Sequence, residues 1–240
     1  MNGILIVDKS KGITSHDVVD IIRDRFKIKK VGHTGTLDPL ATGLLVVLIG
    51  KATKLSNNLL SSDKEYEVNC LLGVKTDTDD LEGKIIKKQN QLNVTKEDLE
   101  KVLSKFKGKI KQKVPRYSAV KLKGKKLYEL ARKNKNFKVP VREVIIYDLD
   151  IIKFELPEVK LRVRCSKGVY MRSLSRDIGE ILGCGGCVSR LRRVRSWPFS
   201  IDEAVKLKTL KNLDRSELEK LVLPIKDNES LQRFIQSKKS

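Results

Sequence analysis

The segment 32–43 constrains this chain most, because its three glycines and one proline stand directly before an uninterrupted apolar run. Glycine adopts backbone conformations that other residues avoid, so the segment predicts a long, shaped loop rather than a helix. The apolar run that follows, residues 44–49, is typical of a strand in the interior of a sheet. Apart from His33, the only ionisable side chain of this loop is Asp38.

The rest of the chain mixes strand and helix patterns without a regular alternation between them. Residues 159–165 alternate between apolar and other side chains, which predicts a strand with Lys160, Arg162 and Arg164 on one face. The other predicted strands are 4–7, 44–49, 65–73, 144–147, 149–151 and 190–195, and helices are expected after Thr14 or Ser15, after Thr95, over 170–182 and after Ser200. We therefore expect an α+β fold, with a central mixed, mostly antiparallel sheet flanked by helices and loops.

The charge of the chain points to a polyanionic partner. Lys and Arg number 51 against 30 Asp and Glu, so the net charge is +21, far more than solubility requires. A lysine-rich surface without a binding role is the alternative. The basic residues are dense in 107–138, where Pro115 and Gly124 interrupt the pattern. This stretch predicts a protruding insertion rather than part of the core.

Several function classes find no support in the sequence. The apolar runs are too short to span a membrane, and no signal peptide is readable at the start, so we expect a cytoplasmic protein. Cys184 and Cys187 have the spacing of a zinc or redox pair, but no second pair follows. Gly50-Lys51 is followed by Ala52, which breaks the pattern of a nucleotide-binding P-loop. The acidic run 77–83 is interpreted as a solvated turn rather than a calcium loop. We expect neither a metal nor a cofactor.

Asp38 leaves two interpretations open when its loop is considered alone. A carboxylate between Leu37 and Pro39, on a loop that enters a buried strand, can serve as a nucleophile or a base. Aspartate before proline is also a common turn former.

Residues 32–45 closely resemble the signature of the TruB family, the tRNA pseudouridine synthases that act on uridine 55 of the T-loop. The resemblance continues in family order and covers the chain to about residue 224. The matching segments are 8–15, 64–66, 114–121, 125–132, 168–174 and 191–193. It implies a pseudouridine synthase fold and an isomerase without a cofactor.

The resemblance also assigns roles to individual residues. Asp38 would be the nucleophile that attacks either C6 of uracil or C1′ of ribose. Arg172 would pair with that carboxylate, and Tyr66 would stack on a uridine turned out of its loop. The remaining expectations are that Leu191 packs against the same pocket, that His33 contacts the flipped nucleotide, and that Lys9 and Arg192 contact RNA.

For the domain organisation, we expect a catalytic domain over 1–225, in which 107–138 is a thumb-like insertion that binds RNA. Residues 226–240 are expected to form a short polar tail, without the PUA domain that many family members carry. The partner would be the T-arm of tRNA, and we expect a monomer that needs no protein partner. Two alternatives remain: a catalytically silent RNA-binding protein on the same scaffold, and a synthase that depends on a guide RNA.

Overall fold

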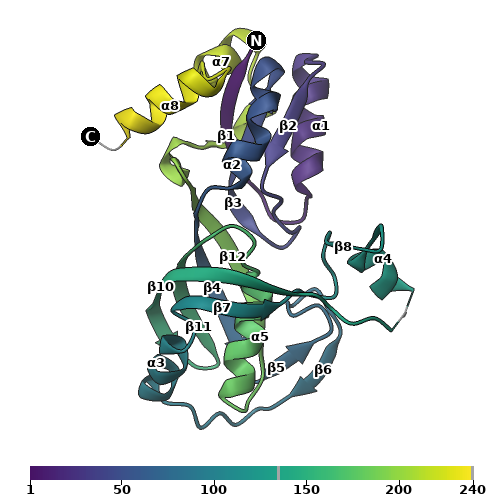
Figure 1. The fold of residues 1–240 in the computed structure, drawn as a ribbon, viewed down its shortest axis with the longest axis vertical. Helices are drawn as coiled ribbons and strands as arrows, with labels where there is room; N and C mark the ends of the chain where they lie inside the picture. The colour runs from purple at the N-terminus through teal and green to yellow at the C-terminus, as the bar shows by residue number, and fades with distance from the viewer. Residues whose placement is uncertain (134–135, 239–240) are drawn as a thin grey trace. The chain divides into compact units, whose positions relative to one another are not determined.

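The computed structural model describes residues 1–133 and 136–238. Residues 134–135 of the predicted thumb-like insertion and 239–240 of the predicted tail lie outside the described residues. The chain divides into two units (Figure 1). The first unit combines Met1–Tyr66 with Arg192–Ser240, and the second unit is Glu67–Leu191. Two strands, β4 (Lys64–Leu72) and β12 (Gly186–Ser196), contribute residues to both units.

The sheet of the first unit is built around β3 (Thr42–Ile49), whose residues after Thr42 are all buried, as the apolar run predicted. The strand β1 (Gly3–Lys9) runs antiparallel to β3, with Gly3 opposite Ile49 and Lys9 opposite Gly43. The other edge of β3 pairs antiparallel with β2 (Val31–Thr34) and parallel with β12. The short strands β13 (Phe199–Ser200) and β14 (Val205–Lys206) pair with β12 and β1. This sheet is therefore mixed, as predicted.

Helix α1 (Ser15–Phe26) forms where the sequence predicted a capped helix with one apolar face. The side chain of Thr14 accepts a hydrogen bond from the Asp17 amide, and the Asp17 carboxylate accepts one from the Thr14 amide. This capping box starts the helix, whose buried face includes Val18, Val19 and Ile22. The other helices of the unit are η1 (Gly50–Leu55), α2 (Ser56–Leu60), η2 (Ile201–Glu203), α6 (Leu207–Leu210), α7 (Arg215–Leu221) and α8 (Asn228–Ser237).

Helix α8 falls where a polar tail was expected. Its Leu231 is buried in the core cluster of the first unit, and the Phe234 ring stacks on Phe199 with the ring centroids 5.4 Å apart. Asp227 caps the helix by accepting a hydrogen bond from the Ser230 amide. The polar residues occupy one face of an amphipathic helix, and the few apolar ones hold it to the core.

The sheet of the second unit has the strand order β4, β11 (Glu158–Cys165), β10 (Val141–Glu155) and β7 (Gly108–Lys113). Strand β11 alternates as the sequence predicted, with Leu161, Val163 and Cys165 buried. The three basic residues of its other face form ion pairs: Lys160 and Arg162 with Glu67, and Arg164 with Asp148. These cations therefore stabilise the outer face of the sheet.

Helix α5 (Met171–Ile181) contacts β7, and α3 (Lys96–Ser104) contacts both α5 and β10 (Figure 1). Gly179 allows α5 to approach the backbone of Gly185 closely, since a Cβ at this position would lie 2.2 Å from the Gly185 carbonyl carbon. A two-stranded sheet, β5 (Val74–Thr76) with β6 (Ile85–Lys88), completes this part of the unit.

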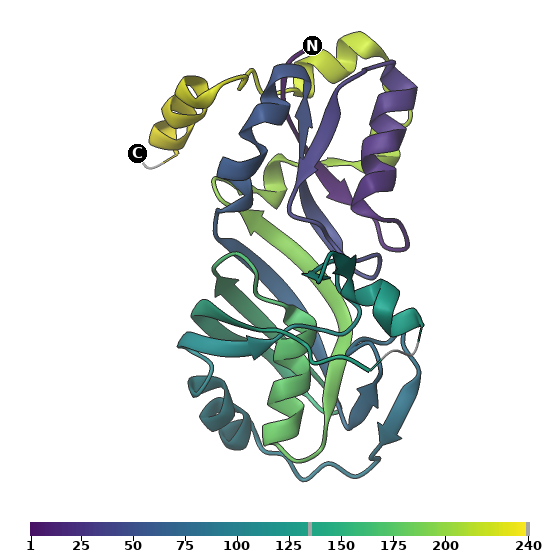
Figure 2. The same cartoon turned by 45° about the vertical axis from the view of Figure 1, so that its right-hand side comes forward.

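The protruding part of the stretch 107–138 is shorter than the sequence suggested. Residues Gly108–Lys113 form β7 and pair antiparallel with β10, so they belong to the sheet. Beyond them, the hairpin of β8 (Lys121–Leu122) and β9 (Lys125–Lys126), together with α4 (Leu127–Arg132), projects from the rest of the second unit (Figure 1). Figure 2 shows the same segment after a turn of 45°. Across the described residues, no helix combines the length and apolarity that crossing a membrane requires.

Candidate active site

The predicted site residues are divided between the two units. Asp38, His33, Lys9, Tyr66 and Arg192 belong to the first unit, and Arg172 and Leu191 to the second. Tyr66 lies in β4 and is half-buried, while Leu191 lies in β12 and is 8% exposed.

Asp38 lies on the connection between β2 and β3, where its apolar neighbours fix the backbone. Leu37 and Leu40 are each 3% exposed and Ala41 is fully buried, whereas Asp38 itself is half-buried. The Ala41 amide donates to the Asp38 carbonyl at 3.0 Å, which closes a turn. Buried side chains on both sides thus hold the backbone at Asp38 in place.

The start of α1 holds the same loop through main-chain contacts on either side of Asp38. The Leu37 amide donates to Ser15 Oγ at 2.8 Å, and this hydroxyl lies 3.2 Å from the Leu37 carbonyl oxygen. The Gly12 amide donates to the Pro39 carbonyl at 2.9 Å. These hydrogen bonds use the main chain of Leu37 and Pro39, so replacing the Asp38 side chain leaves them in place.

Lys9 is placed differently from the RNA contact that was predicted. Its side chain is fully buried, and its Nζ donates to the carbonyls of Ser10 at 2.9 Å and Ile13 at 2.7 Å. It also lies 3.4 Å from the Pro39 carbonyl, next to Asp38 in the chain. A buried ammonium group that donates to carbonyl oxygens holds the loop in place, and its burial keeps it away from an RNA phosphate.

We expect Lys9→Met to lower the free energy of unfolding by about 1–3 kcal/mol, because buried carbonyls lose their donor. Urea denaturation followed by circular dichroism measures the change. Lys11→Met, at an exposed position two residues away, is the matched control and should leave the stability unchanged. Equal stability of the two variants would contradict the conclusion that the hydrogen bonds of Lys9 stabilise the loop.

Arg192 forms a two-point ion pair with Asp8. Its Nη1 lies 3.0 Å from Oδ1 and its Nη2 lies 2.8 Å from Oδ2 of Asp8. The Arg192 side chain is 38% exposed, so its guanidinium reaches the surface while it remains paired.

His33 lies in β2, where its ring is partly enclosed. Its Nδ1 is buried and has no hydrogen-bond partner among the described residues. Burial lowers the pKa of His33 below 6.5, and the Arg193 guanidinium and His16 lower this pKa further. The imidazole is therefore neutral at neutral pH and can accept as well as donate a hydrogen bond.

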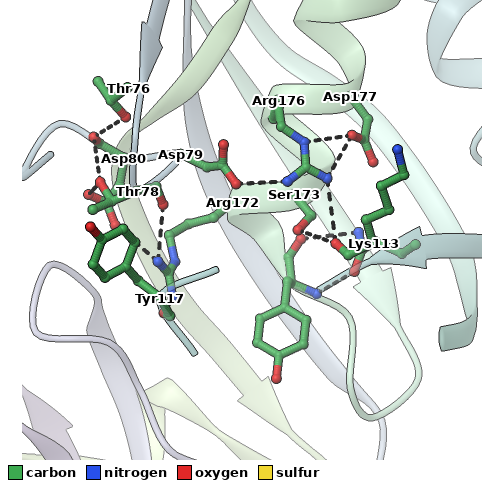
Figure 3. Close-up of polar contacts among 12 residues, drawn as sticks. Thr76, Thr78, Asp79, Asp80, Lys113, Tyr117, Arg172, Ser173, Arg176 and Asp177 are labelled. Carbon is green, nitrogen blue, oxygen red and sulfur yellow. Dashed lines mark hydrogen bonds and ion pairs between the residues drawn. The ribbon is translucent and has the colours of Figure 1, made fainter. Parts of the chain in front are cut away.

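In the second unit, Arg172 is positioned by α5 and is 5% exposed (Figure 3). Its Nη1 donates to the Thr78 carbonyl at 3.1 Å, and its Nη2 donates to the Tyr117 carbonyl at 2.9 Å. Its Nη1 also lies 3.6 Å from Oδ2 of Asp80. Arg172 therefore joins α5 to two segments that are distant in the sequence.

The acidic run 77–83 forms turns, as the sequence predicted, but its Asp80 is buried rather than solvated, which the sequence interpretation missed. Asp80 is 5% exposed, and its Oδ1 accepts from Thr78 Oγ1 at 2.6 Å and from the Glu82 amide at 3.1 Å. Figure 3 shows its carboxylate beside Arg172. A buried carboxylate needs hydrogen-bond donors and a cation nearby. For Asp80 the cation is Arg172 of α5, which is distant in the sequence, so the turn alone does not reveal it.

One helical turn beyond Arg172, Arg176 forms a second ion-pair cluster. It lies 2.8 Å from Oδ2 of Asp79 and 2.9 Å from Oδ1 of Asp177. Burial raises the pKa of Asp79 to about 6, although Arg176 and Arg172 act in the opposite direction. Burial also tends to lower the pKa of Arg176, but Asp79 and Asp177 outweigh it, so this pKa is raised.

The raised pKa of Asp79 predicts a pH dependence of stability. Because the folded-state value of about 6 lies above the ordinary 3.8, folding favours the protonated acid. This contribution is present at low pH and is lost as the pH rises through about 6, with a change of up to about 3 kcal/mol. Urea denaturation between about pH 4 and pH 7 should show a smaller pH slope for Asp79→Asn than for the wild type. An unchanged slope would contradict this assignment.

Comparisons with known proteins identify the family to which this geometry belongs. Residues 23–171 match the TruB family pseudouridylate synthase N-terminal domain, and residues 172–228 match the tRNA pseudouridylate synthase B C-terminal domain. The chain belongs to the TruB family. It is therefore an isomerase of the pseudouridine synthase class, as the resemblance implied.

The TruB family relatives and related structures support this assignment. The tRNA pseudouridine synthase B of Francisella tularensis subsp. tularensis (strain WY96-3418) is 47% identical over 214 residues, which are 89% of this chain and 71% of the relative. That of Francisella philomiragia is also 47% identical, with the same coverage. A Cbf5-Nop10-Gar1 complex contains a chain with 30% identity and a TM-score of 0.73. The match covers 92% of this chain and 60% of that one, which confirms the pseudouridine synthase fold.

Proposed function

We propose that this TruB family chain converts uridine 55 in the T-loop of tRNA to pseudouridine, with Asp38 as the nucleophile. The observation that carries the proposal is the Asp38 loop: a half-buried carboxylate on a backbone held by Ser15, Gly12 and Lys9, in a chain of a pseudouridine synthase family. Relatives with 47% identity are named tRNA pseudouridine synthase B. We propose the cytoplasm as its compartment, because tRNA is available there.

The reaction is an isomerisation, so atoms and electrons balance without a cofactor. The bond between N1 of uracil and C1′ of ribose breaks, and a bond between C5 and C1′ forms. The proton at C5 leaves to solvent and N1 gains a proton. Asp38 would form a covalent intermediate at C6 or at C1′ that allows the uracil to rotate before the new bond forms.

The other predicted residues would act around this step. Arg172 would pair with the Asp38 carboxylate and orient it, and Tyr66 would stack on the flipped uracil. Leu191 would pack against the base, and His33 and Arg192 would contact the nucleotide and the RNA backbone. The uridine must leave its stack first, since no side chain reaches C6 or C1′ inside a folded loop.

The second unit offers chemistry suited to RNA. At the root of the thumb-like insertion, a cavity of about 820 Å³ has a lining of mixed charge. It includes the basic Lys111, Lys113 and Arg116, the aromatic Phe137, and the acidic Asp77, Asp79, Asp177 and Glu180. The Arg116 guanidinium lies 4.6 Å from the centre of the Phe137 ring. Basic and aromatic side chains together bind phosphates and unstacked bases. We propose that this insertion closes over the T-arm and that 1–225 form the catalytic domain.

A second candidate is a synthase directed by a guide RNA. The observation that favours it is the similarity to Cbf5 and to an H/ACA RNP bound to a substrate RNA, the latter with 28% identity and a TM-score of 0.68. We favour the stand-alone enzyme, because the relatives with higher identity are named tRNA pseudouridine synthase B.

The test uses the purified full chain alone with an unmodified tRNA transcript. Pseudouridine is mapped by chemical labelling and primer extension. The proposal expects modification at uridine 55 and none in a transcript with cytidine at that position. Modification only after a guide RNA and partner proteins are added would favour the second candidate. Tight tRNA binding without any modification would favour a silent RNA-binding protein.

A further inference from the structure

The side chain of Arg193 is among the largest fully buried ones of the chain, with 1% exposure. Burying a guanidinium costs free energy unless its donors are satisfied, and a carboxylate is the usual partner. Over residues 1–133 and 136–238, no carboxylate lies within ion-pair distance of Arg193. By contrast, its neighbours on β12 are paired in the ordinary way, Arg192 with Asp8 and Arg195 with Glu65. An ion pair therefore does not explain the burial of Arg193.

The hydrogen bonds of Arg193 are directed at the two ends of the Asp38 loop. Its Nη2 donates to the Gly35 carbonyl at 2.9 Å, and its Nε donates to the Leu44 carbonyl at 2.7 Å. Gly35 precedes Asp38 in the chain, and Leu44 follows it at the start of β3. One rigid, planar guanidinium therefore bridges the backbone on both sides of the loop.

Two glycines allow the loop ends to approach Arg193. Gly43 is opposite Arg193 in the parallel pairing of β12 with β3, and its φ is +99°. A Cβ at Gly43 would lie 2.3 Å from the Arg193 carbonyl oxygen, a distance that no real side chain tolerates. Gly35 has a φ of +71°, and a Cβ there would lie 3.2 Å from Nη1 of Arg193. Gly43 thus allows β3 to approach the main chain of Arg193, and Gly35 leaves room for its guanidinium.

We propose that Arg193 is a positioning residue, which fixes both ends of the Asp38 loop and thereby sets the place of the Asp38 carboxylate. This inference rests on the proposed function, in which Asp38 is the nucleophile. Arg193 acts through the main chain and does not itself touch the reacting atoms. Its charge also reaches His33 of the same unit, whose pKa it helps to lower after the larger effect of burial.

The expected consequence of losing this bridge is a loss of rate rather than of RNA binding. A displacement of a catalytic group by about 1 Å can cost about 10²-fold in rate. We expect Arg193→Met, which keeps the apolar stem but removes both donors, to lower kcat by about 100-fold and to change KM for tRNA by less than about threefold. Arg193→Lys keeps the positive charge but lacks the planar guanidinium with its several donors. Its kcat should therefore be about tenfold higher than that of Arg193→Met. Arg195→Met, on the same strand with a side chain that is 58% exposed, is the control and should retain wild-type kcat.

Two further measurements separate positioning from general destabilisation. All assays are made at a temperature where urea denaturation shows each variant to be fully folded. NMR of the imidazole groups then reports locally, because His16 and His33 are the only histidines of the chain. In Arg193→Met, we expect the His33 signal to move and the His16 signal, from an exposed side chain on α1, to stay in place.

Several results would overturn the proposal. A fully folded Arg193→Met variant with wild-type kcat would do so, and so would one whose KM rises while its kcat is unchanged. Asp38→Asn is measured in parallel. If Asp38→Asn is inactive while Arg193→Met is fully active, only the positioning role fails. If Asp38→Asn is fully active, the nucleophile assignment fails, and the positioning role fails with it. If the wild type does not modify tRNA, both inferences are wrong.

Discussion

Asp38→Asn is expected to abolish pseudouridine formation, with a loss of about 10⁴-fold or more in kcat. The amide has nearly the shape of the carboxylate but cannot act as the nucleophile. The loop should remain in place, because the bonds that hold it use the main chain of Leu37 and Pro39. The variant should therefore bind tRNA with unchanged affinity, which filter binding can measure.

The control for Asp38→Asn is Asp24→Asn, which changes an exposed aspartate of α1. This control should retain wild-type kcat. Activity of Asp38→Asn within about tenfold of the wild type would refute Asp38 as the nucleophile, since nucleophile removal costs far more than this. A variant that is inactive because it has lost its fold would be recognised by its urea transition.

Arg172→Met is expected to have the second large effect, on both stability and activity. It leaves the buried Asp80 carboxylate without its cation and the carbonyls of Thr78 and Tyr117 without a donor. Removing one partner of a buried ion pair typically costs about 3–5 kcal/mol, so the urea midpoint should fall markedly. If Arg172 also pairs with Asp38 as proposed, kcat should fall by about 10²-fold or more under conditions where the variant is folded.

Arg176→Met is the matched control for Arg172→Met, because it lies on the same helix and also belongs to an ion-pair cluster. It should lose stability but keep most of the wild-type kcat. The double variant Arg172→Met with Asp80→Asn should recover part of the lost stability, since no unpaired charge remains buried. Equal kcat values of the two folded single variants would mean that Arg172 is only structural.

The sequence predicted the elements whose folding depends on local pattern. Strand β11 alternates visibly, β3 is continuously apolar, and α1 starts after Thr14, one of the two residues expected to cap it, so neighbours in the sequence determine these elements. The resemblance to the TruB family supplied the candidate site, which composition and spacing alone had left open between a nucleophile and a turn former.

What the sequence could not predict depends on partners far away in the chain. Lys9 looks like a surface lysine until the Pro39 carbonyl, thirty residues later, is placed beside it. Asp80 looks like part of an acidic turn, because its cation Arg172 comes from a distant helix. Helix α8 looks like a polar tail, because few of its residues, Leu231, Phe234 and Ile235, form the face that packs on the core. In each case, tertiary contacts override the local composition.

The most direct test of the account is the release of hydrogen from C5 of uridine. A tRNA transcript labelled with tritium at C5 of its uridines is incubated with the purified chain, without a guide RNA or any other protein. We expect release that stops at one tritium per tRNA and that disappears both in Asp38→Asn and in a transcript that lacks uridine 55. Release that persists in either case, or tRNA binding by the wild type without any release, would contradict this expectation.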